Sequence, residues 1–125
     1  MQNTSISFEV FEKKIMGKLL YGSNHILPIL RKQYEKAQIK NRKFTGVGFF
    51  TDFIVPKDVP RLPNLKSFHL GNVAGKINGT DIGLVLFIKD GVLNFLEGYT
   101  FGDDPWPDKI INYELWHTNY DQQKK

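Results

Sequence analysis

The Asp90-Gly91 dipeptide is the feature that most constrains the fold, because it joins two apolar segments across a very short connection. Asp-Gly favours a two-residue type I′ turn, whose twist matches that of two paired antiparallel strands. The sequence therefore predicts a hairpin made of residues 82–89 and 92–101. Setting the turn also sets the register, and with it the side chains that share a face.

The predicted register places Glu97 on the apolar face of this hairpin. The expected opposite pairs are Ile88 with Leu93, Leu86 with Phe95, Leu84 with Glu97, and Ile82 with Tyr99. A buried carboxylate needs a partner, or its pKa rises until it is neutral. Glu97 is thus expected to be largely buried and paired, and it is the first candidate for a functional residue.

The first forty residues repeat with a helical period. Apolar residues recur at this spacing at Phe8, Phe11, Ile15 and Leu19, and Gly22 follows. This pattern predicts a helix over residues 7–21. Ser23-Asn24 can cap a second helix, whose first turn tolerates Pro28. We therefore expect a helical hairpin over residues 7–40.

After Asn41 the period changes to two, which predicts one long strand over residues 43–55. In that strand Gly46 and Gly48 would share a face with Asp52. Glycines at i and i+2 leave the backbone bare, so an aromatic ring or another backbone segment should pack over them. The prolines of residues 56–65 then exclude a ladder and predict an extended loop.

The last third of the chain adds a weaker strand over residues 67–77 and a second turn at Asn78-Gly79. Residues 107–118 fit either a final strand or a helix that starts at Pro107. Trp106 lies between two prolines, which order its backbone before any contact forms. We expect its ring to be anchored near Tyr99 and Phe101 rather than mobile.

These elements predict an α+β fold, with an N-terminal αα-hairpin packed on one face of an antiparallel sheet of about five strands. By length, residues 1–125 form a single domain, with an ordered core over about 6–118 and a frayed tail over 119–125. Two helices can cover only one face of the sheet. The other face must be solvated, dimerised or used for binding.

Composition excludes several classes of site and location. The chain has no cysteine, so disulfides, thiolate metal sites and cysteine nucleophiles are excluded. The longest apolar run, residues 84–88, is too short to span a bilayer, and the first residues lack the pattern of a signal peptide. We therefore expect a cytoplasmic protein that does not engage a membrane.

Charge is distributed unevenly along the chain. Residues 1–66 carry twelve basic and five acidic side chains, whereas residues 67–125 carry five and eight. Such asymmetry can steer a charged partner or favour head-to-tail contacts. Residues 31–43 hold six basic side chains and one acid, which could contact nucleic-acid phosphates, but no nucleic-acid-binding motif accompanies them.

Catalytic and metal patterns are missing from the sequence. His25, His69 and His117 show no ligand spacing, so neither a metal site nor a cofactor is expected. Asp52 and Glu97 are the carboxylates embedded in apolar strand sequence. If their strands are adjacent they could act as a general acid and base. Alternatively, Glu97 is structural and is paired with Arg42, a lysine or a tyrosine.

Several sequence strings together resemble a group of small bacterial proteins of unassigned function. They are Arg42-Lys-Phe-Thr-Gly-Val-Gly-Phe-Phe-Thr51, Gly71-Asn-Val73, Asp90-Gly-Val-Leu93, Leu96-Glu-Gly-Tyr-Thr100 and Trp106-Pro107. The Asp-Gly-x-Leu-x-x-Leu-Glu segment is also similar to the last hairpin of some small immunity-type proteins that neutralise toxins. The resemblance implies a bacterial origin and assigns no catalytic residue.

The sequence therefore favours a non-enzymatic protein-binding module of immunity or accessory type, which binds another protein or a second copy of itself. The candidate binding residues are Glu97, Tyr99, Gly46, Gly48, Asp52 and Trp106. The first alternative is a small-molecule-binding protein or an enzyme that uses Glu97 and Asp52 as acid and base. The second alternative is nucleic-acid binding through residues 31–43.

Overall fold

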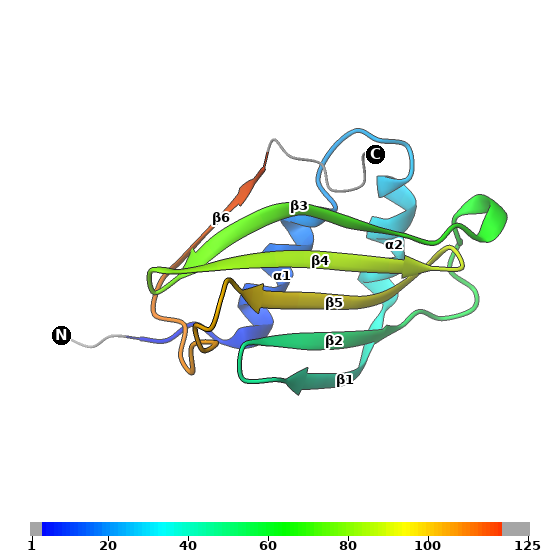
Figure 1. The fold of residues 1–125 in the computed structure, drawn as a ribbon. Coiled ribbons are helices and arrows are strands. Elements are labelled where there is room, and N and C mark those ends of the chain that lie inside the picture. The colour runs from blue at the N-terminus through cyan, green and yellow to red at the C-terminus, as the bar shows by residue number, and fades with distance from the viewer. Residues whose placement is uncertain (1–3, 119–125) are drawn as a thin grey trace.

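The computed structural model describes residues 4–118, which form two helices followed by six strands (Figure 1). Helix α1 spans Phe8–Leu19, and its first turn is capped by Ser7, whose hydroxyl accepts a hydrogen bond from the Val10 amide at 3.2 Å. Helix α2 spans Leu27–Lys36 and carries Pro28 in its first turn, as expected. The predicted frayed tail, residues 119–125, lies outside the described residues.

The prediction of one long strand over residues 43–55 is wrong. Two antiparallel strands, β1 (Gln38–Phe44) and β2 (Gly48–Ile54), occupy this region. Gly46 has a φ of 93°, and the Thr45 amide donates to the Gly48 carbonyl at 2.9 Å, so the chain reverses between them. Helix α2 correspondingly ends at Lys36 instead of residue 40, because Ala37 is already extended. The sheet therefore has six strands rather than about five.

The other strands follow the predicted turns. They are β3 (Phe68–Ile77), β4 (Thr80–Lys89), β5 (Val92–Thr100) and β6 (Tyr113–His117). Asn78-Gly79 and Asp90-Gly91 both have positive φ angles, as type I′ turns require. The proline-rich segment before β3 is a loop with a single 3₁₀ turn, Pro63–Leu65. All neighbouring strands are antiparallel, in the order β1-β2-β5-β4-β3-β6.

The register of the β4–β5 hairpin differs from the predicted one because of a bulge. Ile88 does pair with Leu93, but the next pair is Phe87 with Phe95, so Asn94 is an extra residue in β5. Every later pair is shifted by one residue, and Glu97 lies opposite Val85 instead of Leu84. The shift moves Glu97 to the opposite face of the sheet.

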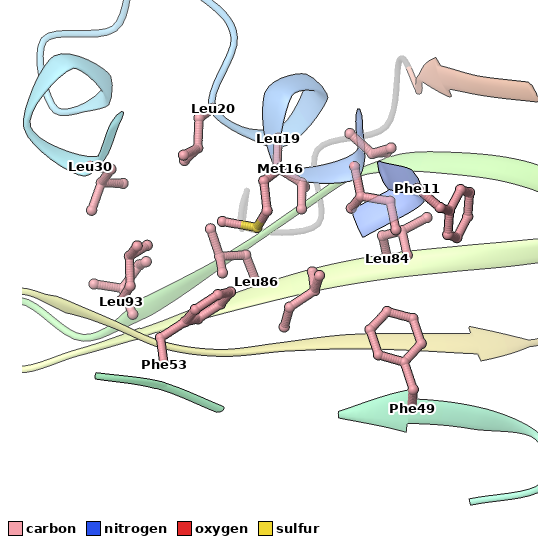
Figure 2. Close-up of a cluster of buried hydrophobic side chains, with 14 of the residues drawn as sticks. Phe11, Met16, Leu19, Leu20, Leu30, Phe49, Phe53, Leu84, Leu86 and Leu93 are labelled. Carbon is pink, nitrogen blue, oxygen red and sulfur yellow. The ribbon is translucent and has the colours of Figure 1, made fainter. Parts of the chain in front are cut away.

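Both helices lie behind one face of the sheet, as Figure 1 shows. Figure 2 shows the core between the helices and the sheet, with Met16 of α1 and Leu30 of α2 directed toward the strands that carry Leu86 and Phe53. We call this side the covered face and the opposite side the open face. No helix within residues 4–118 combines the length and apolar character needed to cross a bilayer.

Candidate functional site

A row of four aromatic side chains crosses the open face. Strand alternation places Phe50 of β2, Phe95 of β5, Phe87 of β4 and His69 of β3 on this face, each half-buried. The Phe87 and Phe95 rings stack at 4.4 Å between centroids. Phe50 contacts Phe95 edge-on at 5.8 Å, and His69 lies 5.7 Å from Phe87. We refer to these four residues as the ring row.

Tyr99 and Trp116 extend the aromatic character of this face toward one end of the sheet. The Tyr99 ring lies over Gly83, where any Cβ would overlap it, and it contacts the exposed Phe101 ring at 5.6 Å. Trp116 pairs with Ala74 at the β6 edge and is 38% exposed. An exposed surface with this many large rings is typical of an interaction site.

Asp52 and Glu97 flank the ring row on adjacent strands. Asp52 lies opposite Phe95 and Glu97 lies opposite Phe50, so the two carboxylates are diagonal neighbours across β2 and β5. Partial burial raises the pKa of Glu97 above its ordinary value. Burial also raises the pKa of Tyr99, and the Glu97 carboxylate adds to that rise. Within residues 4–118, neither carboxylate forms a hydrogen bond or an ion pair.

The expectation that Glu97 is largely buried and paired is therefore wrong. The bulge at Asn94 turns Glu97 away from the covered face, so the carboxylate remains half-exposed to water. Asp52 and Glu97 share a face on neighbouring strands, but no hydrogen bond connects them. The arrangement offers two hydrogen-bond acceptors beside aromatic rings, which suits a cationic group of a binding partner.

Within residues 4–118 the buried, paired carboxylate is that of Glu12, which the sequence reasoning missed. Glu12 lies on the covered side of α1 and is 3% exposed. Its carboxylate accepts hydrogen bonds from Arg42 of β1 at 2.6 Å and from the Thr51 hydroxyl of β2. A signal was present in the sequence, because Glu12 follows Phe8 by four residues and so falls on the apolar stripe of the helix.

Arg42 completes this cluster on its more exposed side. Its guanidinium lies 5.0 Å from the centre of the Phe8 ring and 3.8 Å from the Glu9 carboxylate. Nearby Tyr34 has its pKa raised to about 12, mainly by burial and further by the Glu12 charge, while Arg42 acts in the opposite direction. The cluster joins α1 to β1 and β2, and its geometry is that of a structural ion pair.

Gln33 makes a second buried polar connection. Its amide group donates to the carbonyls of Pro60 and Gly91 at 2.9 and 3.0 Å, and its oxygen accepts from the Leu93 amide at 2.9 Å. The side chain is completely buried, and all three bonds go to backbone groups. Gln33 therefore ties α2 to the β4–β5 turn and to the proline loop, which holds the hairpin in place.

The other predicted site residues, Gly46, Gly48 and Trp106, lie outside the ring row. Gly48 lies in β2, where a Cβ would overlap the Gly98 backbone, so the predicted backbone contact is confirmed. Gly46 is in the turn with nothing packed over it, and the prediction of a glycine strip is wrong there. Trp106 is anchored at 8% exposure, but its ring packs on Phe49 of the covered face at 5.2 Å instead of near Tyr99 and Phe101.

Comparison of the chain with protein-family models, with curated proteins and with solved structures gave no match. The candidate site is therefore defined by its geometry alone. In the described part of the chain, His, Asp and Glu side chains nowhere gather in threes as they would around a metal ion.

Proposed function

We propose that this chain is a non-enzymatic bacterial protein-binding module of immunity or accessory type that acts in the cytoplasm. Its binding surface would be the open face of the sheet. The ring row, flanked by the unpaired Asp52 and Glu97 carboxylates, carries this proposal. Aromatic rings are the side chains most often found at the energetic centre of protein interfaces.

The chemistry of this face points to a partner that presents basic side chains. A guanidinium can stack on an aromatic ring while its N–H groups donate to a neighbouring carboxylate. Asp52 and Glu97 provide the acceptors, since Asp81, another carboxylate of this face, already accepts a hydrogen bond from Lys76 at 2.6 Å. A partner of this kind would gain both apolar contact area and charge-assisted hydrogen bonds.

Self-association through the same face is less well supported. Strand β5, which carries Glu97, is one of the two central strands of the sheet. Two copies packed face to face about a two-fold axis through the centre would bring like carboxylates close together. Repulsion between them favours a different partner over a second copy.

The two alternative functions have less geometric support. Asp52 and Glu97 lie on an open surface, where water screens them and competes for any reacting group. The basic segment 31–43 is split between α2 and β1, and Arg42 is already engaged by Glu12. An acid/base enzyme needs an enclosed site, which the open-face carboxylates do not form. Nucleic-acid binding through residues 31–43 needs a continuous basic surface, which that segment does not form.

The proposal is tested by affinity capture from bacterial lysate with a matched pair of variants. The combined change D52K, F95S and E97K alters only half-exposed side chains of the open face. The control, D58K, reverses a charge on exposed Asp58 of the proline-rich loop, which lies on neither proposed binding surface. A protein captured by the wild type and by D58K, but lost with the triple variant, supports binding at this face, provided that circular dichroism shows both variants folded. Retention by the triple variant would contradict it.

A further inference from the structure

Two hollows meet on the solvent side of α1. One, of about 690 Å³, lies between α1 and α2, and the other, of about 480 Å³, lies toward His117 of β6. They share the side chains of Lys13 and Tyr21 and the backbone of Gly17. Together they form a continuous depression, the Gly17 groove, on the side of the molecule opposite to the open face.

Gly17 lies inside the last turn of α1, where glycine still favours the helix less than other residues do. It is exposed, and a Cβ built on it would meet nothing within 4 Å. The fold therefore has no steric need for glycine at this position. A bare helix backbone at the centre of a groove lets another chain approach more closely than any side chain would allow.

The rim of the groove is strongly basic. Four lysines, at 13, 14, 18 and 32, line it together with Arg31. Arg31 donates to the Leu20 carbonyl at 2.6 Å, which holds its guanidinium at the end of α1. Within residues 4–118 these lysines form no ion pair, and Glu35 is the one acidic side chain that lines either hollow. The groove thus presents five cationic side chains against a single carboxylate.

The floor of the groove between the two helices is apolar. Met16 and Leu20 close it from below at 0% and 2% exposure, so the apolar surface that a ligand can reach comes from the Tyr21 ring and from Pro28 of α2. Tyr21 stands at the junction of the two hollows, 75% exposed, with its ring 5.8 Å from the His117 imidazole. An apolar floor with a cationic rim can hold an aliphatic side chain while the lysines neutralise acids on either side of it.

We propose that the Gly17 groove binds an acidic peptide segment of a partner protein. Carboxylates of the segment would contact the lysines, and one aliphatic side chain would pack on Tyr21 and Pro28. A single-stranded nucleic acid fits less well, because successive bases stack on a series of free rings, whereas the exposed rings that line the groove, Tyr21 and His117, already contact each other at 5.8 Å. This inference is independent of the open-face proposal, since the two surfaces share no residue.

The test uses fluorescence anisotropy with a labelled peptide of Asp and Glu residues around one central Leu. We expect saturable binding to the wild type and at least a tenfold loss of affinity with K13E and K32E combined. The control, K57E with K89E, changes net charge equally at exposed lysines outside the groove. Equal weakening by the two double variants would show nonspecific charge attraction and overturn the proposal.

Gly17 provides the sharper variant, because its substitution separates binding from folding. G17Q fills the groove and also replaces a poor helix former with a better one, so its melting temperature should rise. We expect its affinity for the peptide to fall at least tenfold despite that rise. Unchanged affinity would overturn the proposal.

Two competitor ligands test the chemistry of the occupant. A peptide with Ser in place of the central Leu should bind at least fivefold more weakly, because it leaves the apolar floor unfilled. Equal binding of the Ser peptide would overturn the role of the floor. A single-stranded oligonucleotide should compete poorly, and stronger binding of the oligonucleotide than of the peptide would overturn the assignment to protein.

Discussion

Each face of the six-stranded sheet has an acidic side chain close to aromatic rings, but the hydrogen-bond partners of that side chain differ between the two faces. On the covered face, Glu12 is buried and accepts hydrogen bonds from Arg42 and Thr51. On the open face, Glu97 is half-buried beside Phe50 and has no such partner within residues 4–118. A buried carboxylate whose charge is balanced by an ion pair and hydrogen bonds connects parts of the fold, whereas a carboxylate without such partners is available to a ligand.

The same contrast applies to the large aromatic rings. Trp106 and Phe49 pack against each other on the covered face, where Phe49 is completely buried and Trp106 nearly so. Trp116 on the opposite side remains 38% exposed. Rings on the covered face should therefore contribute mainly to folding, and rings on the open face mainly to recognition. Substitutions in matched pairs across the sheet can break or sharpen this division.

The largest expected effect is that of Trp106→Ala. Truncating a buried aromatic ring costs roughly 3–5 kcal/mol of unfolding free energy, because transfer energy is lost and a cavity remains. Trp116→Ala is the matched control and should cost less than about 1 kcal/mol. Urea denaturation followed by circular dichroism measures both. Similar losses for the two tryptophans would break the division between the faces.

The next effect in size is that of Glu12→Ala. Its removal leaves the Thr51 hydroxyl and the Arg42 guanidinium without their acceptor in a buried place. We expect a loss of about 2–3 kcal/mol, below the usual range for a broken buried pair because Arg42 reaches water on one side. Glu9→Ala removes the exposed partner of Arg42 and should cost less than about 0.5 kcal/mol. Equal losses of stability for the two variants in thermal melts would show that the hydrogen bonds of Glu12 to Arg42 and Thr51 do not stabilise the fold.

Gly48→Val tests a constraint that comes from strand pairing and not from either face. Although valine has high β-propensity, its Cβ would overlap the Gly98 backbone, so we expect a loss of about 1–3 kcal/mol. Ile54→Val, on the same strand and in an exposed position, should change stability by less than about 0.5 kcal/mol. A stabilised Gly48→Val variant would mean that the two backbones can separate without cost.

The smallest effect is expected for Glu97→Gln. The raised pKa means that folding favours the protonated form, so ionisation of Glu97 lowers stability as pH rises through its folded pKa. At pH 7 the variant should therefore be as stable as the wild type or up to about 0.5 kcal/mol more stable. The difference should disappear below the unfolded pKa of glutamate. A clearly less stable variant at pH 7 would point to a favourable partner for the carboxylate.

The sequence by itself determined most local elements of this protein, except the β1–β2 hairpin, which was predicted as the end of a helix and one long strand. The other elements reflect preferences that a few neighbouring residues are enough to express. The examples are the glycine turns at 79 and 91, the helical period of residues 8–19 and the strand period beyond residue 41. With two helices placed before the strands, an α+β fold with one uncovered sheet face followed. The aromatic character of that face was not foreseen, because the predicted register assigned Phe95, Glu97 and Tyr99 to the covered face.

Tertiary structure decided which surface each critical side chain occupies. The bulge at Asn94 shifts the register after one correct pair, and no local residue pattern distinguishes it from a regular ladder. The partners of Glu12 lie 30 and 39 residues away along the chain, so only the packing of α1 on β1 and β2 brings them together. Because strand alternation has a period of two, one extra residue reverses every later assignment. The amide of Leu93, next to that residue, is held by Gln33, which lies 60 residues away along the chain.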